Sequence, residues 1–296
     1  MKFRTEITLS PAAFSISHSD KVMMIGSCFV ENISERMLHA GFAVNVNPFG
    51  VVYNPASVAD SLRQLIVYQP YTEEDLFLHE GIYHSFSHHS RFSGTDKVAV
   101  LEKINTSLAE ASDFLRQANL LIITFGTASV YCLASTGEIV SNCHKLPARE
   151  FEEKRLTVEQ ITELWKQLIK ELRTVNPDLK ILFTVSPIRH RKHGEHANQL
   201  SKSVLLLAID EIVQSHTQCF YFPAYEIVLD DLRDYRFYAD DLIHPNSQAI
   251  EYIWEKFSDT YFEPPTVELI REYEKQQKRN AHKPIITSNA LIINNS

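Results

Sequence analysis

A short turn near the start of the chain carries two side chains that can act as nucleophiles. Residues 26–29, Gly-Ser-Cys-Phe, follow the apolar run 22–25 and precede a helical pattern over residues 30–40. Glycine permits a tight bend from strand to helix, and a helix start favours an anion on the thiol of Cys28 or the hydroxyl of Ser27. The segment therefore predicts a nucleophile turn. The alternative interpretation is a plain loop of small residues.

A second segment, near the end of the chain, pairs a carboxylate with an imidazole. Asp241 stands three residues before His244, and Pro245 then suits the first turn of a helix patterned over residues 249–257. A carboxylate at this spacing accepts the ring N–H of the histidine, fixes its tautomer and leaves the other nitrogen free as a general base. The alternative is a capping aspartate beside a surface histidine.

Two polar clusters follow apolar segments and are candidates for substrate recognition. One holds Asn142, His144 and Lys145, and the other begins at Arg189. A carboxylate or phosphate suits Lys145 or Arg189, because a guanidinium matches such groups with two hydrogen bonds. The alternative for both clusters is a solvated basic loop.

Four histidines, at positions 79, 84, 88 and 89, invite a metal hypothesis, since closely spaced imidazoles bind zinc or iron. Residues 68–98 show neither the carboxylate partners nor the helical or Cys-x-x-Cys spacing that aligns ligands. We therefore predict no metal and no cofactor, and we expect His89 to form part of a pocket wall.

The elements that must position these side chains form an alternating pattern. Short apolar runs predict buried parallel strands, and each lies near a helical pattern. Such alternation indicates an α/β sheet between helix layers, with the ligand crevice at the carboxyl ends of the strands. The predicted strands are 22–25, 120–124, 181–185 and 219–222, and the predicted helices are 30–40, 158–172, 196–215 and 249–257.

Together the two chemical segments resemble the SGNH (GDSL-like) hydrolase superfamily, and more closely the GSCFA family. The family's name matches residues 26–29, which Val30 follows, and the resemblance spans roughly residues 20–260. Further stretches that carry it are 47–50, 125–128, 142–145, 186–190 and 235–238. The resemblance implies a three-layer α/β/α sandwich with a parallel, flavodoxin-like sheet, and an acyl-ester enzyme.

The resemblance leaves the nucleophile open between two neighbours. In the usual hydrolase turn the nucleophile stands two residues after the glycine, which is the position of Cys28 here. A neighbouring His244 and a helix start would favour its thiolate. Ser27 is the alternative, since a shift of one residue would bring its hydroxyl forward, and Cys28 would then be core packing.

The resemblance also implies oxyanion donors, and one of them is absent. The expected donors are the amide of the nucleophile, Gly50, and an asparagine two residues after Gly126, but that position is Ala128. Losing one donor typically costs on the order of a hundredfold in rate. Candidate substitutes are Thr127, Ser129, Asn142 and the backbone amides near Gly126.

The expected function is cleavage of an acyl ester, with a carbohydrate or cell-envelope precursor as the implied substrate. Acyl transfer at the same site is the first alternative, and a catalytically silent carbohydrate-binding or ligand-binding module is the second. The family resemblance is of bacterial type, and a fold alone does not determine a reaction.

Bulk properties narrow the class of protein and its partners. The chain has 296 residues and a formal net charge of −8, with scattered basic residues, which argues against nucleic acid and favours a small-molecule or glycan ester. We expect no leader, no membrane span and four reduced cysteines, hence a cytoplasmic location. The predicted division is one domain over residues 1–265, with an insertion at about 68–98, and a polar helix and disordered tail over residues 266–296.

Overall fold

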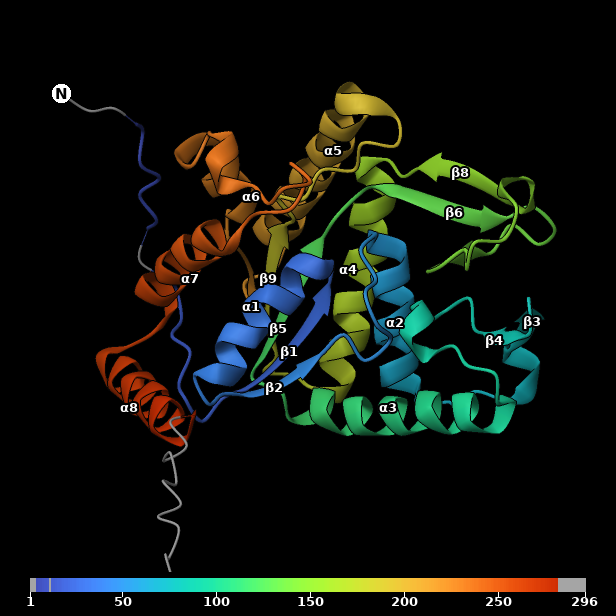
Figure 1. Ribbon diagram of the computed structural model, residues 1–296, viewed down its shortest axis with the longest axis horizontal. Helices are drawn as coiled ribbons and strands as arrows, with labels where there is room; N and C mark the ends of the chain where they lie inside the picture. Colours follow the sequence, from blue (N-terminus) through green and yellow to red (C-terminus); the bar gives the residue numbers. More distant parts are fainter. Residues whose placement is uncertain (1–3, 11, 282–296) are drawn as a thin grey trace, which may run out of the picture.

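The computed structural model describes residues 4–10 and 12–281, and its centre is a five-stranded parallel sheet (Figure 1). The strand order is β10-β9-β5-β1-β2. Numbered along the chain within this sheet, the order is 2-1-3-4-5 from the β2 edge, which is the flavodoxin-like order. The expected fold class is confirmed. The strands are β1 (Lys21–Gly26), β2 (Ala43–Val46), β5 (Leu120–Phe125), β9 (Lys180–Val185) and β10 (Cys219–Tyr221).

Side chains of β1 alternate between two hydrophobic cores, one on each face of the sheet. Met23 and Ile25 belong to the core under one helix layer, and Val22 and Met24 belong to the core under the other. This alternation makes the three-layer sandwich. The first layer contains α2 (Pro55–Val67), α3 (Lys97–Gln117), α4 (Val158–Val175) and α5 (Gly194–Ser215), and the second contains α1 (Cys28–His39), α6 (Ala224–Glu226), α7 (Ser247–Tyr261) and α8 (Pro264–Ala281).

The helices begin at side chains that cap them. Ser27 caps α1, Asp96 caps α3 and Asn246 caps α7, each by accepting a backbone N–H of the first turn. The caps of α1 and α7 matter most for the site, because each stands beside one of the two chemical segments. The direction in which Cys28 and His244 leave the backbone is therefore set by local helix-start geometry.

Two helices and several short strands were not predicted. No element was assigned to α2 or α3, although the buried positions of α3, from Val100 to Leu115, recur at helical spacing. An antiparallel sheet of order β7-β6-β8 extends from the main body, as Figure 1 shows. Its strands are β6 (Ser129–Leu133), β7 (Ile139–Val140) and β8 (Phe151–Arg155).

The segment predicted as an insertion contains a small hairpin and two turns of 3-10 helix. The hairpin joins β3 (Phe77–His79) to β4 (Ile82–His84), and the turns are η1 (Glu73–Asp75) and η2 (Ser90–Phe92). Arg91 connects this segment to the sandwich, because its guanidinium donates to the carbonyl of Asn47 and pairs with Glu31 of α1 at 3.1 Å. The division into domains stays a prediction.

The C-terminal helix starts earlier than expected and is partly anchored. It begins at Pro264, before the range 266–296 that was predicted for the polar helix and tail, and Thr266 and Ile270 are buried against the sandwich. The predicted disordered tail, residues 282–296, lies outside the described residues, as do residues 1–3. Within the described part of the chain, no helix combines the length and the apolar character needed to span a bilayer.

Candidate active site

The two chemical segments meet at the carboxyl end of the central sheet. The Sγ atom of Cys28 lies 3.6 Å from Nε2 of His244, and Nδ1 of His244 lies 2.6 Å from Oδ2 of Asp241. Cys28 is half-buried at the first position of α1, directly after β1, whereas the side chain of His244 is 45% exposed. A substrate can therefore reach the space between thiol and imidazole from solvent.

Ser27 is placed differently from its neighbour. It is 3% exposed, its Oγ accepts the N–H of Phe29 at 3.3 Å, and its own N–H donates to the carbonyl of Thr124 at 3.2 Å. The hydroxyl thus caps α1 instead of facing the imidazole. In the structure the side chain that His244 contacts is Cys28.

Asp241 is held as an anion that orients His244. Its Oδ1 accepts the N–H groups of Ile243 and His244, each at 2.9 Å, and its Oδ2 accepts from the His244 ring. The amide of His244 contributes most to holding the pKa of the Asp241 carboxyl down at about 2. With Nδ1–H directed at this carboxylate, the lone pair of His244 lies on Nε2, which faces Cys28.

The sequence favoured a thiolate at Cys28, but the structure places this thiol where its protonated form is favoured. Burial raises its pKa above the usual value, and Glu31 of the same helix raises it further. The amides at the start of α1 and the ammonium of Lys202 act in the opposite direction, but burial outweighs them. At neutral pH Cys28 therefore carries its proton and requires a base to remove it, which is the position that His244 occupies.

Lys202 of α5 is a buried lysine beneath this site. It is 1% exposed, and its Nζ donates to the carbonyls of Gly126 and Ser186, each at 2.6 Å. Those two carbonyls follow the ends of β5 and β9, so one side chain ties together the two strand ends that flank the site. Burial lowers the pKa of Lys202 to about 7.

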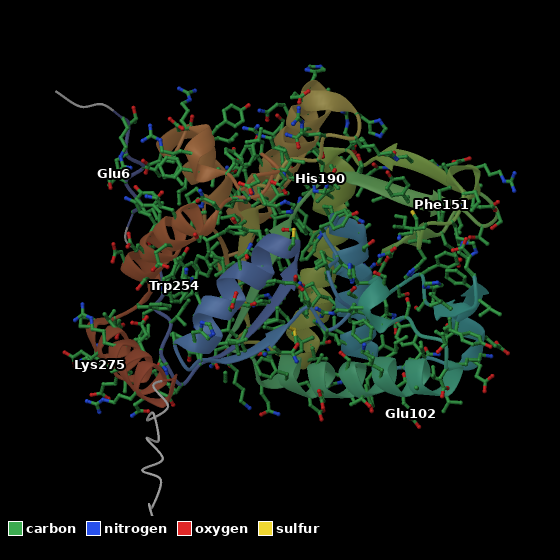
Figure 2. All side chains as sticks on the ribbon, viewed as in Figure 1. Glu6, Glu102, Phe151, His190, Trp254 and Lys275 are labelled. Atoms are coloured by element: carbon green, nitrogen blue, oxygen red, sulfur yellow. The ribbon has the colours of Figure 1, made fainter. Side chains whose placement is uncertain are left out.

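His190 stands over Gly126 at the same end of the sheet. A Cβ atom at position 126 would lie 3.0 Å from Nε2 of His190 and 3.1 Å from Cβ of Tyr53, so these side chains approach the glycine more closely than they would approach a larger residue. Figure 2 shows His190 at the end of the molecule toward which the central strands point, near α5 and β6. Burial, followed by the charges of Lys202 and His244, lowers the pKa of His190 to about 4, so its imidazole is neutral at physiological pH.

Two of the expected oxyanion donors are already engaged inside the protein. The N–H of Gly50 donates to the carbonyl of Asn47, and the N–H of Gly126 donates to the carbonyl of Tyr53, both at 2.7 Å. Gly50 is required for another reason, because its φ is +79° and an added Cβ would lie 2.2 Å from Cβ of His89. His89 accordingly packs on the turn that contains Gly50.

Thr127 and Ser129, expected as substitutes for the missing asparagine, lie on the rim of a cavity of about 180 Å³ that His190 also lines. Thr127 is tied down, since its Oγ1 lies 2.9 Å from Oγ of Ser201 and accepts the N–H of Ser129 at 3.1 Å. Ser201 also accepts the N–H of Ala128 at 2.7 Å. The side chains around Ala128 are therefore engaged in hydrogen bonds inside the protein, and Ala128 itself has no side-chain donor.

Asn142, His144 and Lys145 line a second cavity, of about 560 Å³. This cavity shares the side chains of Tyr53 and Tyr131 with the one beside Thr127, so the two adjoin. Lys145 is exposed, whereas His144 is buried with its Nε2 2.8 Å from the carbonyl of Ser85. Arg189 lines a different cavity, on the side of α6.

His84 and His88 of the insertion, and His144 outside it, are packing groups. The rings of His84 and His144 lie 4.4 Å apart, and His88 packs between Phe49 and Tyr71 with ring centroids 5.0 and 4.9 Å away. Burial lowers the pKa of His88 to about 3 and that of His144 to about 4. Both rings are therefore uncharged at neutral pH, and both pack in the interior while making a hydrogen bond.

Comparison with known proteins decides the family. A model of the GSCFA family matches residues 21–257. The chain belongs to the GSCFA family. The matched range runs from the first residue of β1 to α7, and so contains Cys28, Asp241 and His244.

Solved structures similar to this GSCFA protein include three carbohydrate esterases. One is of family 3, from Talaromyces cellulolyticus, with 11% identity over 86% of this chain and 99% of that chain and a TM-score of 0.39. Another is an acetyl xylan esterase from Butyrivibrio proteoclasticus, with 11% identity over 82% and 63% and a TM-score of 0.41. The third is of family two, from Clostridium thermocellum, with 13% identity over 88% and 66% and a TM-score of 0.39. Among curated proteins no significant match is found.

Two residues of the GSCFA site were missed in the sequence, Lys202 and His190. Lys202 falls on the buried stripe of α5 together with Leu205 and Ile209, at helical spacing. A lysine on an apolar stripe is the pattern that could have identified it. His190 lies within a run of basic residues, where a solvated loop was the natural interpretation.

Proposed function

We propose that this protein cleaves acyl esters through Cys28, with His244 as general base and Asp241 as the group that orients it. One observation carries the proposal: the chain of contacts from Oδ2 of Asp241 through the His244 ring to Sγ of Cys28, at 2.6 and 3.6 Å. This is the arrangement of nucleophile, base and orienting carboxylate that nucleophilic catalysis requires.

The reaction has two halves. In the first, Nε2 of His244 takes the thiol proton, Sγ of Cys28 bonds to the acyl carbon, and the alcohol leaves with the proton that His244 returns. In the second, His244 removes a proton from water, the hydroxide attacks the thioester, and the acid departs while Cys28 regains its proton. Asp241, held ionised by two amides, stabilises the imidazolium in both halves.

The thiol is favoured over the neighbouring hydroxyl for a geometric reason. Ser27 is buried and its Oγ is occupied as the cap of α1, so reaching His244 would cost the helix its cap. Cys28 stands at the first helical position, where backbone N–H groups have no partner within the helix. Its own amide is therefore available to an oxyanion that forms on the acyl group.

The substrate class we propose is an ester of a carbohydrate or cell-envelope precursor. The adjoining cavities beside Cys143 and Thr127 support it, because their shared lining contains the rings of Tyr53 and Tyr131 together with Glu153 and Lys192. Aromatic faces flanked by polar groups suit a polyhydroxylated molecule.

The test is turnover of a panel of acyl para-nitrophenyl esters, with acyl-coenzyme A donors measured alongside. Cys28→Ala and His244→Ala are each expected to abolish turnover. Mass spectrometry of the digested wild type is expected to show an acyl adduct on the peptide that contains Cys28. Turnover that survives in Cys28→Ala and disappears in Ser27→Ala would transfer the role to the serine.

A second candidate function is a binding module that has kept the fold without the reaction. It is favoured by the engaged amides of Gly50 and Gly126 and by the alanine at position 128, which leave the oxyanion with few donors. Absence of an adduct with every donor, together with binding of xylo- or glucan oligosaccharides, would support this candidate. Acyl transfer differs only in the second half-reaction, and release of transferred ester in place of free acid would identify it.

A further inference from the structure

A cavity of about 560 Å³ lies beside the proposed catalytic site, on the side of α6. Arg189, Tyr235 and Tyr238 form one wall, and Tyr225 and Gln199 line it as well. The cavity contains neither Cys28 nor His244, and the reaction outlined above makes no use of it.

Arg189 is held by two tyrosines, because it hydrogen-bonds the side chains of both Tyr235 and Tyr238, and its remaining N–H donors are available. Its guanidinium carbon lies 4.7 Å from the ring centroid of Tyr238 and 5.6 Å from that of Tyr235, and one terminal nitrogen donates to the hydroxyl of Tyr238 at 3.0 Å. A guanidinium carries five N–H donors, so stacking against the ring faces leaves its edge able to bind a planar or tetrahedral oxyanion.

Of the two guanidinium groups that line the cavity, Arg189 is the one that forms no ion pair, although its charge helps to lower the pKa of Glu195, which lies outside the lining. Asp230 pairs with Arg233 at 3.9 Å and Asp234 pairs with Arg236 at 2.9 Å. Both oxygens of Glu226 accept the hydroxyl of Tyr221, at 2.9 and 2.8 Å, and burial raises the pKa of this carboxyl. Within residues 4–10 and 12–281, no carboxylate forms an ion pair with Arg189.

The cavity is joined to the catalytic side chains by short stretches of backbone. Arg189 directly precedes His190, which stands over Gly126. Tyr238 pairs with Pro245 in an isolated bridge, and the N–H of the next residue, Ala239, donates to the carbonyl of His244 at 2.7 Å. A ligand bound at Arg189 would therefore rest against the loop that carries the general base.

We propose that this cavity is a subsite for an anionic group, carboxylate or phosphate, on the ester that reacts at Cys28. The inference rests on the proposed function for its link to catalysis, but the binding of an anion at Arg189 does not depend on turnover. The substrate class then narrows to esters that carry a negative charge away from the reacting carbonyl. An Arg–oxyanion contact with two hydrogen bonds corresponds to roughly ten- to hundredfold in affinity.

The first experiment measures binding without catalysis. Inorganic phosphate, and separately acetate, are titrated into the wild-type protein, Arg189→Met and Arg189→Lys by calorimetry at low ionic strength. We expect binding to the wild type that Arg189→Met loses and Arg189→Lys keeps in weakened form, because lysine offers a point charge without the planar fork. Arg271→Met is the matched control, since Arg271 is exposed on α8 and does not line the cavity.

The second experiment compares esters that differ only in charge. The values of kcat/KM are measured for para-acetoxybenzoate, para-acetoxyphenyl phosphate and the neutral para-acetoxybenzamide. The wild type and Arg271→Met are expected to prefer a charged ester by roughly tenfold or more, and Arg189→Met is expected to bring that ratio close to one. Whether the carboxylate or the phosphate gives the larger ratio identifies the anion.

The outcomes separate the two proposals. Anion binding that is equal in the wild type and Arg189→Met, or absent from both, overturns the subsite. A charge preference that survives in Arg189→Met overturns it as well. Phosphate binding that requires Arg189, in a protein that turns over none of the esters, would retain the anion subsite and reject the proposed hydrolase function.

Discussion

The Sγ atom of Cys28 lies 3.6 Å from Nε2 of His244, although 216 residues separate them in the chain. Each reaches this position from a helix start, Cys28 at the first residue of α1 and His244 in the loop before α7. Burial keeps the thiol protonated, and the nearest base is an imidazole whose lone pair is directed at it by Asp241. The proposed reaction therefore depends on a proton transfer between these two side chains.

Replacing Asp241 with asparagine is expected to reduce kcat by about a hundredfold to ten-thousandfold. The asparagine amide would present N–H where the carboxylate accepted, so His244 would turn its Nε2–H toward the thiol and lose its role as a base. Steady-state kinetics with a para-nitrophenyl ester measures the change. Asp240→Asn is the matched control, because Asp240 is the adjacent exposed carboxylate. Equal losses in the two variants would contradict the orienting role.

Ser27→Ala and Cys28→Ala are expected to separate stability from activity. Ser27→Ala removes the cap of α1 and should lower the free energy of unfolding by about 1 kcal/mol, whereas Cys28→Ala keeps the cap. Urea denaturation measures the first effect, and ester turnover is expected to fall much further in Cys28→Ala. A Ser27→Ala variant that keeps full stability and loses all turnover would make Ser27 the nucleophile.

The parts of this fold that could be predicted from the sequence are those written in local patterns. The runs 22–25, 120–124 and 181–185 became β1, β5 and β9 within one residue at each end, because fully buried parallel strands are continuous apolar segments. The approach of Asp241 to His244 follows from their spacing within one turn. In contrast, α2 and α3 were missed, and the region of 68–98 was recognised only as irregular.

The rest of the site depends on contacts that no local pattern records. The sequence shows that Gly50 and Gly126 follow or stand near apolar runs, where turns are expected. It cannot show that their N–H groups are already bonded to the carbonyls of Asn47 and Tyr53. Lys202 reaches the site from α5, which follows β9 in the chain. Its Nζ joins two strand ends by donating to the carbonyls of Gly126 and Ser186. Such residues emerge only when the strand ends are brought together in space.

Lys202→Met is expected to change how stability depends on pH. The pKa of Lys202 in the folded protein is about 7, below the value of roughly 10.4 for an unfolded lysine. Between these values the unfolded chain binds more protons, so the contribution of Lys202 makes the folded state more stable as pH rises, by about 1.4 kcal/mol per pH unit. The variant should lack this slope.

The measurement is urea denaturation at about pH 7.5 and about pH 9.5, where the wild type should gain roughly 2 to 3 kcal/mol relative to Lys202→Met. Lys170→Met, at an exposed position of α4, is the matched control and should retain the wild-type slope. The comparison uses the difference between the two pH values, so it is independent of the hydrogen bonds to Gly126 and Ser186 that the variant also loses. Parallel slopes in the wild type and Lys202→Met would rule out a depressed pKa.

His88→Gln is expected to make the protein more resistant to acid. The pKa of His88 is about 3 in the folded protein, below the unfolded value of roughly 6.5, because the ring is buried against Phe49 and Tyr71. As pH falls below about 6.5, His88 becomes protonated in the unfolded chain but not in the folded protein, so the free energy of unfolding falls by about 1.4 kcal/mol per pH unit until about pH 3.

Urea denaturation at about pH 6.5 and about pH 4.5 should show a smaller loss of stability in His88→Gln than in the wild type. His39→Gln, at an exposed position of α1, should lose as much stability as the wild type, and an equal loss in His88→Gln would mean that His88 is protonated in the folded protein.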